Sequence, residues 1–107
     1  MPYLPGVITP SEVMCGLELG LQAFKFFPAG VMGGVAALRA FNDVFAEVAF
    51  CPTGGIGPDN AKDYLALPNV AAVGSSWLAP ADLLKARDWA GIATRAATLR
   101  ASAGVPG

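Results

Sequence analysis

Four short apolar runs recur along the chain at a nearly constant spacing. They cover residues 2–6, 23–29, 47–55 and 70–76, so that their first residues lie 21, 24 and 23 positions apart. A stretch with helical periodicity follows each run, and the spacing matches the length of one strand–helix unit. The pattern therefore predicts four strand–helix units and an α/β fold with a parallel sheet.

Five helical stretches are expected between and after these runs. Ser11 and Asp59 are placed to cap the first and the third, and Pro80 suits the first turn of the fourth. The residues from 102 to 107 are expected to be a frayed end. The five stretches cover residues 12–22, 33–45, 60–67, 80–87 and about 89–101.

The length of the chain limits how many units it holds. Eight strand–helix units close a TIM (β/α)8 barrel of roughly 200 to 250 residues. With 107 residues, this chain holds four. We therefore expect residues 1–107 to form a single (βα)4 half-barrel of the TIM-barrel family. The first run is abrupt, which favours the C-terminal part of a longer barrel chain.

Composition and charge narrow the classes of function. The chain is 54% hydrophobic and 14% charged, as expected for a parallel sheet buried by helices. A net charge of −1 without a basic cluster argues against nucleic acid as a partner. No apolar run approaches the roughly 18 residues of a membrane span, so no membrane partner is expected. The N-terminal residues lack the features of a signal peptide, and we expect a cytoplasmic protein.

The residue types also limit the chemistry. The chain contains no histidine, which excludes Ser-His-Asp and Cys-His catalysis within it. Cys15 and Cys51 lie in unlike contexts and do not complete a zinc site without histidine, so reduced thiols are expected. No metal and no other cofactor is predicted.

Glycine and hydroxyl residues follow the third and the fourth apolar runs. Thr53-Gly54-Gly55 follows one run and Gly74-Ser75-Ser76 follows the other. In the second half of a barrel these loops would follow strands seven and eight, where TIM barrels commonly bind phosphate through backbone N–H groups. Either loop alone is better explained as a tight turn, but the pair at these positions favours a phosphate site.

One lysine stands inside the aromatic run "FKFF". Side chains alternate along a strand, so Lys25 and Phe27 share one face while Phe24 and Phe26 take the other. If the latter pair packs on helices, Lys25 points into the barrel, where desolvation favours a nucleophilic amine. The alternative is a lysine that reaches solvent from the end of the strand. Spacing alone favours the lysine that reaches solvent.

The stretches "LPGVITPSEVM", "LQAFKFFPAG", "FCPTGGIGPDN" and "VGSSWLAP" resemble the second half of 2-keto-3-deoxy-6-phosphogluconate (KDPG) aldolases, which are grouped with 4-hydroxy-2-oxoglutarate (KHG) aldolases. The resemblance covers nearly the whole chain. It implies that Lys25 forms a Schiff base without a metal and that Thr53 lies beside the bound pyruvyl group. It also implies that Gly54, Gly55, Ser75 and Ser76 bind the substrate phosphate, and that Pro5 and Phe27 line the pocket.

The sequence departs from that family in two respects. Gly30 stands where the family usually has a glutamate after "FFPA". The family's catalytic glutamate and the arginine that binds the pyruvyl carboxylate come from the first half-barrel, which this chain does not contain. No local acid is expected to replace that glutamate. This expectation applies to Glu12, Glu18, Glu47, Asp59 and Asp63.

Two functions remain open on these grounds. The first is a class I aldolase that cleaves a phosphorylated keto sugar acid to pyruvate and glyceraldehyde 3-phosphate, its general base missing here. The second is a non-catalytic half-barrel that binds phosphate. The resemblance implies a homotrimer for the complete enzyme. A lone half-barrel would expose an inner face carrying Phe27 and either Val48 or Ala49, so we expect it to pair with a second half-barrel or to be poorly soluble.

Overall fold

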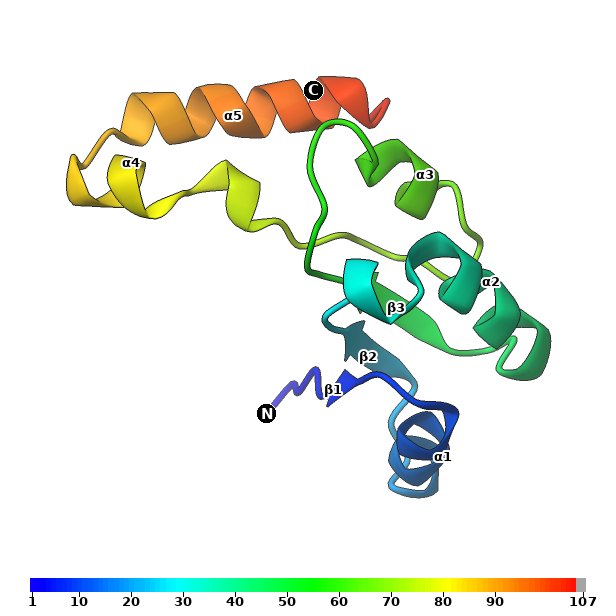
Figure 1. Ribbon diagram of the computed structural model, residues 1–107. Helices are drawn as coiled ribbons and strands as arrows, with labels where there is room; N and C mark the ends of the chain where they lie inside the picture. Colours follow the sequence, from blue (N-terminus) through cyan, green and yellow to red (C-terminus); the bar gives the residue numbers. More distant parts are fainter. Residues whose placement is uncertain (106–107) are drawn as a thin grey trace.

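The sheet consists of three parallel strands in the order of the sequence (Figure 1). In the computed structural model, which describes residues 1–105, Gly6 pairs with Lys25 and Lys25 pairs with Cys51. These three residues therefore form one row across the sheet. The predicted α/β fold with a parallel sheet is confirmed. The strands are β1 (Gly6–Val7), β2 (Ala23–Phe26) and β3 (Ala49–Pro52).

The first strand is shorter and later than its apolar run predicts. Of residues 2–6, only Gly6 lies in β1. Pro2 and Pro5 have no N–H group to donate to a neighbouring strand, so this part of the run cannot complete a ladder. The carbonyl oxygen of Pro5 still accepts the N–H of Lys25 at 2.8 Å.

The fourth apolar run lies beside β3 without forming a regular strand. Its contacts with the sheet include two isolated parallel bridges, Phe50 with Val70 and Thr53 with Gly74. Alanine and glycine, which favour strands weakly, make up much of residues 70–76. The prediction of a fourth strand is therefore confirmed in position and direction, but the segment does not form a regular strand.

All five helical stretches form helices, although the third and the fourth are short. Pro80 occupies the cap position of the fourth helix, one residue before the first turn in which it was expected. Two short 3-10 turns, η1 (Gly30–Met32) and η2 (Ser76–Leu78), follow β2 and the fourth run. The helices are α1 (Pro10–Glu18), α2 (Gly34–Val44), α3 (Ala61–Leu65), α4 (Ala81–Lys85) and α5 (Trp89–Ser102).

The cap of α1 is Thr9, so the prediction of Ser11 is wrong. Pro10 occupies the first turn, where its missing N–H costs nothing, and this moves the cap to the preceding residue. The hydroxyl of Thr9 accepts the N–H of Glu12 at 3.2 Å, and the Glu12 carboxylate accepts the N–H of Thr9 at 3.0 Å. The two residues form a reciprocal capping box.

The two other predicted termini also differ in detail. Asn60, and not Asp59, occupies the cap position of α3. After α5, Gly104 has a φ of 75°, and the N–H of Val105 donates to Arg100 O at 2.9 Å. This left-handed turn closes the helix, so residues up to Val105 form a regular helix end where a frayed end was expected. The remainder of the expected frayed end, residues 106–107, lies outside the described residues.

Alternation along β2 separates the core from the opposite face of the sheet. Phe24 and Phe26 are fully buried against the helices, together with Phe50 of β3. The rings of Phe26 and Phe50 meet edge to face with centroids 6.2 Å apart, and Phe26 meets Phe41 of α2 in the same way at 5.7 Å. These aromatic contacts fix β2 and β3 beneath α2.

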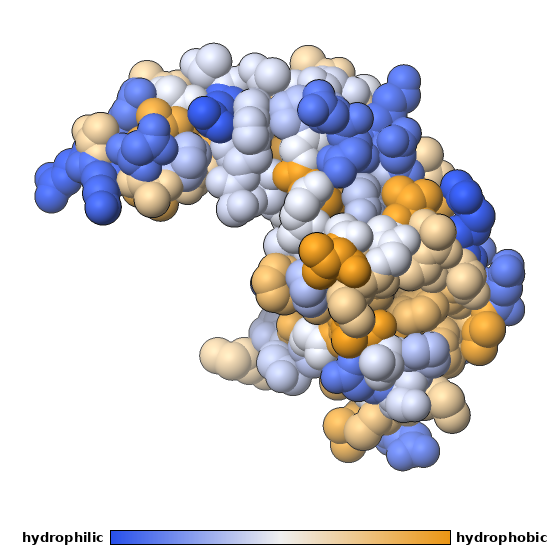
Figure 2. Space-filling view, viewed as in Figure 1, coloured by the Kyte–Doolittle hydropathy of each residue, from blue (hydrophilic) through white to orange (hydrophobic). Residues whose placement is uncertain are grey.

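The molecule is less compact than its length predicts. Its radius of gyration is 14.8 Å, against about 13 Å for a compact domain of this length. Its accessible surface is 6486 Å², against roughly 5,600 Å² for a compact monomer of this mass. Figure 1 shows the reason, because α4 and α5 extend as an arm away from the sheet. In Figure 2 hydrophobic side chains gather over the sheet and its adjoining helices, and a concave outline separates them from this arm.

No helix within residues 1–105 is both long and apolar enough to cross a bilayer.

Candidate active site

Lys25 lies on the face of the sheet opposite the core, as alternation predicts. Its neighbours Phe24 and Phe26 are fully buried, whereas the Lys25 side chain is half-buried. Its Nζ lies 5.0 Å from the centroid of the Phe27 ring. No carboxylate within residues 1–105 pairs with it. The amine is therefore held beside an aromatic ring on a face that this chain leaves partly open.

Phe27 and Thr53 lie one step beyond Lys25, toward the carboxyl ends of the strands. Lys25 is in register with Cys51, and the N–H of Thr53 donates to Phe26 O at 2.9 Å, so Phe27 and Thr53 continue the same register. Because register partners in a parallel sheet share a face, all four side chains lie on the Lys25 face. The structure thus brings Lys25, Phe27 and Thr53 together, as the sequence predicts.

Pro5 does not join this group through its side chain. It precedes Gly6, the register partner of Lys25, so alternation directs its ring to the other face. There it borders a shallow hollow between β1 and α1 with Phe24 and Leu21. The expected role of Pro5 in lining the pocket with Phe27 therefore finds no support in the register, although its carbonyl oxygen holds the backbone of Lys25.

The loop after β3 approaches the loop after β2 closely. The N–H of Gly30 donates to Gly54 O at 3.1 Å. Gly54 has a φ of 105°, and a side chain there would place its Cβ 3.2 Å from both Pro28 Cα and Ala29 N. Gly55 also has a positive φ, of 72°. Within the described residues, the N–H groups of Gly54 and Gly55 have no acceptor, so both can serve a ligand.

The two predicted phosphate loops are tied to each other. The hydroxyl of Ser75 donates to Ile56 O and accepts the N–H of Trp77 at 3.2 Å. Its hydrogen is therefore already committed to the fold, and Ser75 can offer a ligand only its backbone N–H. Ser76 is exposed, and its hydroxyl has no partner among residues 1–105.

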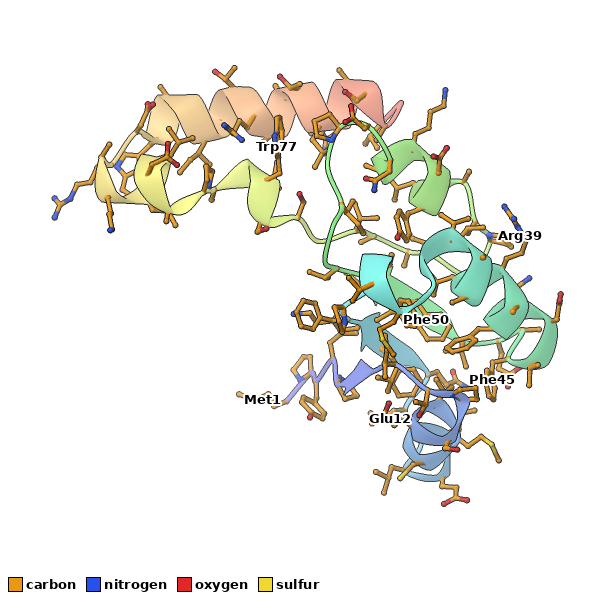
Figure 3. All side chains as sticks on the ribbon, viewed as in Figure 1. Met1, Glu12, Arg39, Phe45, Phe50 and Trp77 are labelled. Carbon is orange, nitrogen blue, oxygen red and sulfur yellow. The ribbon has the colours of Figure 1, made fainter. Side chains whose placement is uncertain are left out.

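Two residues that support these loops were not predicted from the sequence. Asn60 receives the N–H of Gly57 on Oδ1 at 2.9 Å and donates from Nδ2 to Gly55 O at 2.8 Å. Its position just before a helix was the available signal. Arg95 of α5 donates from Nη1 to Trp77 O at 2.8 Å and stacks over the Trp77 ring at 4.7 Å. Figure 3 shows the Trp77 side chain extending from η2 toward α5.

None of the acids considered from the sequence lies buried beside Lys25. The Glu12 carboxylate is bound to Thr9 and to the N–H of Ile8, and these hydrogen bonds hold its pKa below its ordinary value. Within the described part of the chain, no group of three or more His, Cys, Asp and Glu residues could hold a metal ion. All five acids are exposed: Glu12, Glu18, Glu47, Asp59 and Asp63.

Relatives of the chain are aldolases. Residues 1–95 match the family model described as KDPG and KHG aldolase. The KHG/KDPG aldolase of Escherichia coli K12 is 55% identical over 89 residues, which are 83% of this chain and 42% of that protein. The 2-dehydro-3-deoxy-phosphogluconate aldolase of Dickeya dadantii is 53% identical with the same coverage. The chain thus spans less than half the length of these relatives.

Solved structures agree with this relationship. The KDPG aldolase of Legionella pneumophila, crystallised with pyruvate captured as a covalent carbinolamine, has a TM-score of 0.85 and 44% identity over all of this chain and 49% of its own. The enzyme of Zymomonas mobilis ZM4, solved with 3-phosphoglycerate, has a TM-score of 0.72 and 49% identity over 84% of this chain and 44% of its own. From its sequence and its fold, this chain belongs to the KDPG and KHG aldolase family.

Proposed function

We propose that Lys25 is the Schiff-base lysine of a class I aldolase. The observation that carries this proposal is the position of Lys25, which is half-buried and without a carboxylate partner in residues 1–105, beside Phe27 and Thr53. An amine held in this way can attack a ketone. The covalent carbinolamine of pyruvate in the Legionella relative supports this chemistry in the family.

The proposed reaction begins with attack of the Lys25 amine on the C2 carbonyl of the substrate. The resulting carbinolamine loses water and becomes an iminium ion. A base removes the proton of the C4 hydroxyl, the C3–C4 bond breaks, and its electron pair moves toward the iminium as an enamine forms. The aldehyde product, glyceraldehyde 3-phosphate, leaves. Protonation of C3 and hydrolysis then release pyruvate and return the free amine.

The neighbouring side chains have roles that fit their positions. Phe27 offers an apolar wall beside the amine and Thr53 a hydroxyl on the same face, next to the bound pyruvyl group. The backbone N–H groups of Gly54 and Gly55, together with Ser76 and the backbone of Ser75, would bind the substrate phosphate. The 3-phosphoglycerate in the Zymomonas relative supports a phosphorylated ligand in the family.

We also propose that residues 1–107 are the last four strand–helix units of a TIM-type barrel, as one half-barrel. The chain covers 49% of the Legionella aldolase at a TM-score of 0.85, and its Lys25 face is open. The general base and the carboxylate-binding arginine would come from the other half. A homotrimer of the complete enzyme and a cytoplasmic location stay predictions.

The second candidate is a half-barrel that binds phosphate without catalysis. The exposure of the acids Glu12, Glu18, Glu47, Asp59 and Asp63 favours it, because none of these carboxylates lies buried beside Lys25 to accept the proton of the C4 hydroxyl. An assay of pyruvate release coupled to lactate dehydrogenase separates the candidates. Turnover by the chain alone that is lost in Lys25→Ala would exclude the non-catalytic role. Turnover that appears only after addition of the first four strand–helix units of a related aldolase would support the role of this chain as one half of a catalytic barrel.

A further inference from the structure

Arg95 borders a cavity shared with both predicted phosphate loops. The cavity has a volume of about 520 Å³ and opens between the loop after β3, η2 and α5. Gly55 and Ser76, one residue from each loop, form part of its wall together with Trp77. Among the described residues that line it, Arg95 is the only basic one. One cation and N–H donors from two separate loops therefore border the same cavity.

The guanidinium of Arg95 is fixed in place and largely unused. Its Nη1 donates to Trp77 O at 2.8 Å, and its plane stacks on the Trp77 ring at 4.7 Å. The arginine side chain has five N–H donors, so this one hydrogen bond leaves four for a ligand. Asp59 also lines the cavity, but no ion pair joins it to Arg95. Arg95 is half-buried and forms no ion pair with a carboxylate of residues 1–105, so its guanidinium is suited to binding an anion.

The loops alone offer only neutral donors. The N–H groups of Gly54, Gly55 and Ser76 can each donate a hydrogen bond, but none carries a charge. A phosphoryl group carries close to two negative charges at neutral pH. Hydrogen bonds from a charged donor are roughly twice as strong as neutral ones, and the planar guanidinium can bind two phosphate oxygens at once.

We propose that Arg95 is a binding residue for the substrate phosphate, supplying from α5 the positive charge that the two loops lack. This inference rests on the proposed function, because it takes the same phosphate as its ligand. Trp77 orients the guanidinium by stacking and through its carbonyl oxygen, and the N–H of Trp77 is in turn bound to the Ser75 hydroxyl. Arg95 and the loop after the fourth run therefore form one connected unit.

The test is an NMR titration of the 107-residue protein with inorganic phosphate. We expect the amide signals of Gly54, Gly55 and Ser76 to shift, and the Nε–H signal of Arg95 to shift with the same apparent Kd. Arg95→Gln removes the charge and is expected to raise that Kd about tenfold, which corresponds to about 1.4 kcal/mol. Arg95→Lys keeps the charge but lacks the planar guanidinium, and its Kd should lie between those of the wild type and Arg95→Gln.

Arg39→Gln is the matched control. Arg39 is exposed on α2, well separated from Trp77 in Figure 3, so its loss should leave the Kd within about twofold. A second readout separates charge from packing. Between roughly pH 5 and pH 8 a phosphoryl group gains its second charge. The wild type should therefore bind phosphate more tightly at the higher pH, and this difference in Kd should be smaller in Arg95→Gln. A purely structural role of Arg95 would not change the dependence of the Kd on pH.

Three results would overturn the inference. A Kd that is unchanged in folded Arg95→Gln, with the glycine amides still shifting, rejects Arg95 and leaves the phosphate loops intact. If Arg95→Gln does not fold, the wild type decides. An Nε–H signal of Arg95 that does not shift at saturating phosphate also rejects Arg95 as a phosphate-binding residue. If no amide of Gly54, Gly55 or Ser76 responds, the phosphate site itself fails together with Arg95. Schiff-base formation at Lys25 is measured without phosphate and is not affected by any of these results.

Discussion

Ser75 donates its hydroxyl hydrogen to the backbone oxygen of Ile56, so one side chain joins the two loops at the carboxyl end of the sheet. The hydroxyl oxygen of Ser75 also accepts the N–H of Trp77. Adjacent serines therefore have different tasks. Ser75 holds the loops together, whereas Ser76 presents an exposed hydroxyl next to the cavity.

Alanine substitution of the two serines should separate stability from binding. Ser75→Ala leaves the part-buried Ile56 carbonyl without its donor and should lower the free energy of unfolding by about 1–2 kcal/mol. Ser76→Ala should change it by less than about 0.5 kcal/mol and weaken phosphate binding instead. Urea denaturation and the phosphate titration measure the two effects. Equal stability losses in both variants would contradict the division of tasks between the two serines.

Gly54 and Gly55 provide a second matched pair. Both have a positive φ, which costs an alanine about 1–2 kcal/mol. At Gly54 the new Cβ would also meet Pro28 Cα and Ala29 N at 3.2 Å, whereas the nearest such atom at Gly55, Gly30 Cα, is 3.8 Å away. We expect Gly54→Ala to destabilise by roughly 2–4 kcal/mol and Gly55→Ala by about 1 kcal/mol. Urea denaturation curves that are equally shifted would contradict this account of the loop.

The capping box of α1 should make stability depend on acid. Hydrogen bonds from the N–H groups of Ile8 and Thr9, and from the Thr9 hydroxyl, hold the pKa of Glu12 below its ordinary value of 4.5. Because the folded pKa is the lower one, this contribution to stability is complete above about pH 4.5 and is lost as the pH falls through the folded value.

Glu12→Gln keeps an acceptor oxygen but removes the titration. Its stability should therefore fall less than that of the wild type between about pH 6 and pH 3, measured by helix content during denaturation. Glu18→Gln, an exposed glutamate of the same helix, is the control and should follow the wild type. Identical pH profiles for wild type and Glu12→Gln would mean that ionisation of Glu12 does not contribute to the stability of α1.

The sequence predicts the features that follow from periodicity. Alternation placed Lys25 opposite Phe24, and helical periodicity located all five helices, because both depend on residues close in the chain. Of Val48 and Ala49, the register with Ala23 puts Ala49 on the Lys25 face, while Val48 is buried among the helices. That choice needed the pairing of two strands, which one strand's sequence does not contain.

What the sequence did not predict depends on tertiary contacts or on a single neighbouring residue. Thr9 and Ser11 are both hydroxyl residues near the start of α1, and Pro10 between them decides the cap. Arg95 is 18 residues from Trp77, with no spacing rule to connect them. The irregular fourth run follows β3 where Gly74 leaves room for Thr53, since a Cβ there would lie 2.6 Å from Thr53 Oγ1.

The partly open Lys25 face of the sheet predicts association. Phe27 is 51% exposed on the Lys25 face. A second apolar hollow of about 480 Å³, lined in part by Val73, Leu78 and Leu99, lies under α5. Soluble monomers rarely leave such surfaces bare. We expect the isolated chain to pair with a second half-barrel, its own copy included, or to be poorly soluble. Sedimentation equilibrium at micromolar concentration checks this, and a soluble monomer that unfolds cooperatively would refute the half-barrel proposal.

Trapping with borohydride tests the proposed chemistry of Lys25 most directly. The 107-residue protein is incubated with pyruvate and sodium borohydride, which reduces an iminium to a stable secondary amine, and peptide mass spectrometry locates the adduct. Lys62 and Lys85, both exposed on short helices, are internal controls, and Lys25→Ala is the matched variant. We predict one adduct per chain, on Lys25, that is absent from Lys25→Ala. An adduct on Lys62 or Lys85 instead, or none on well-folded protein, would contradict the assignment of Lys25 as the Schiff-base lysine.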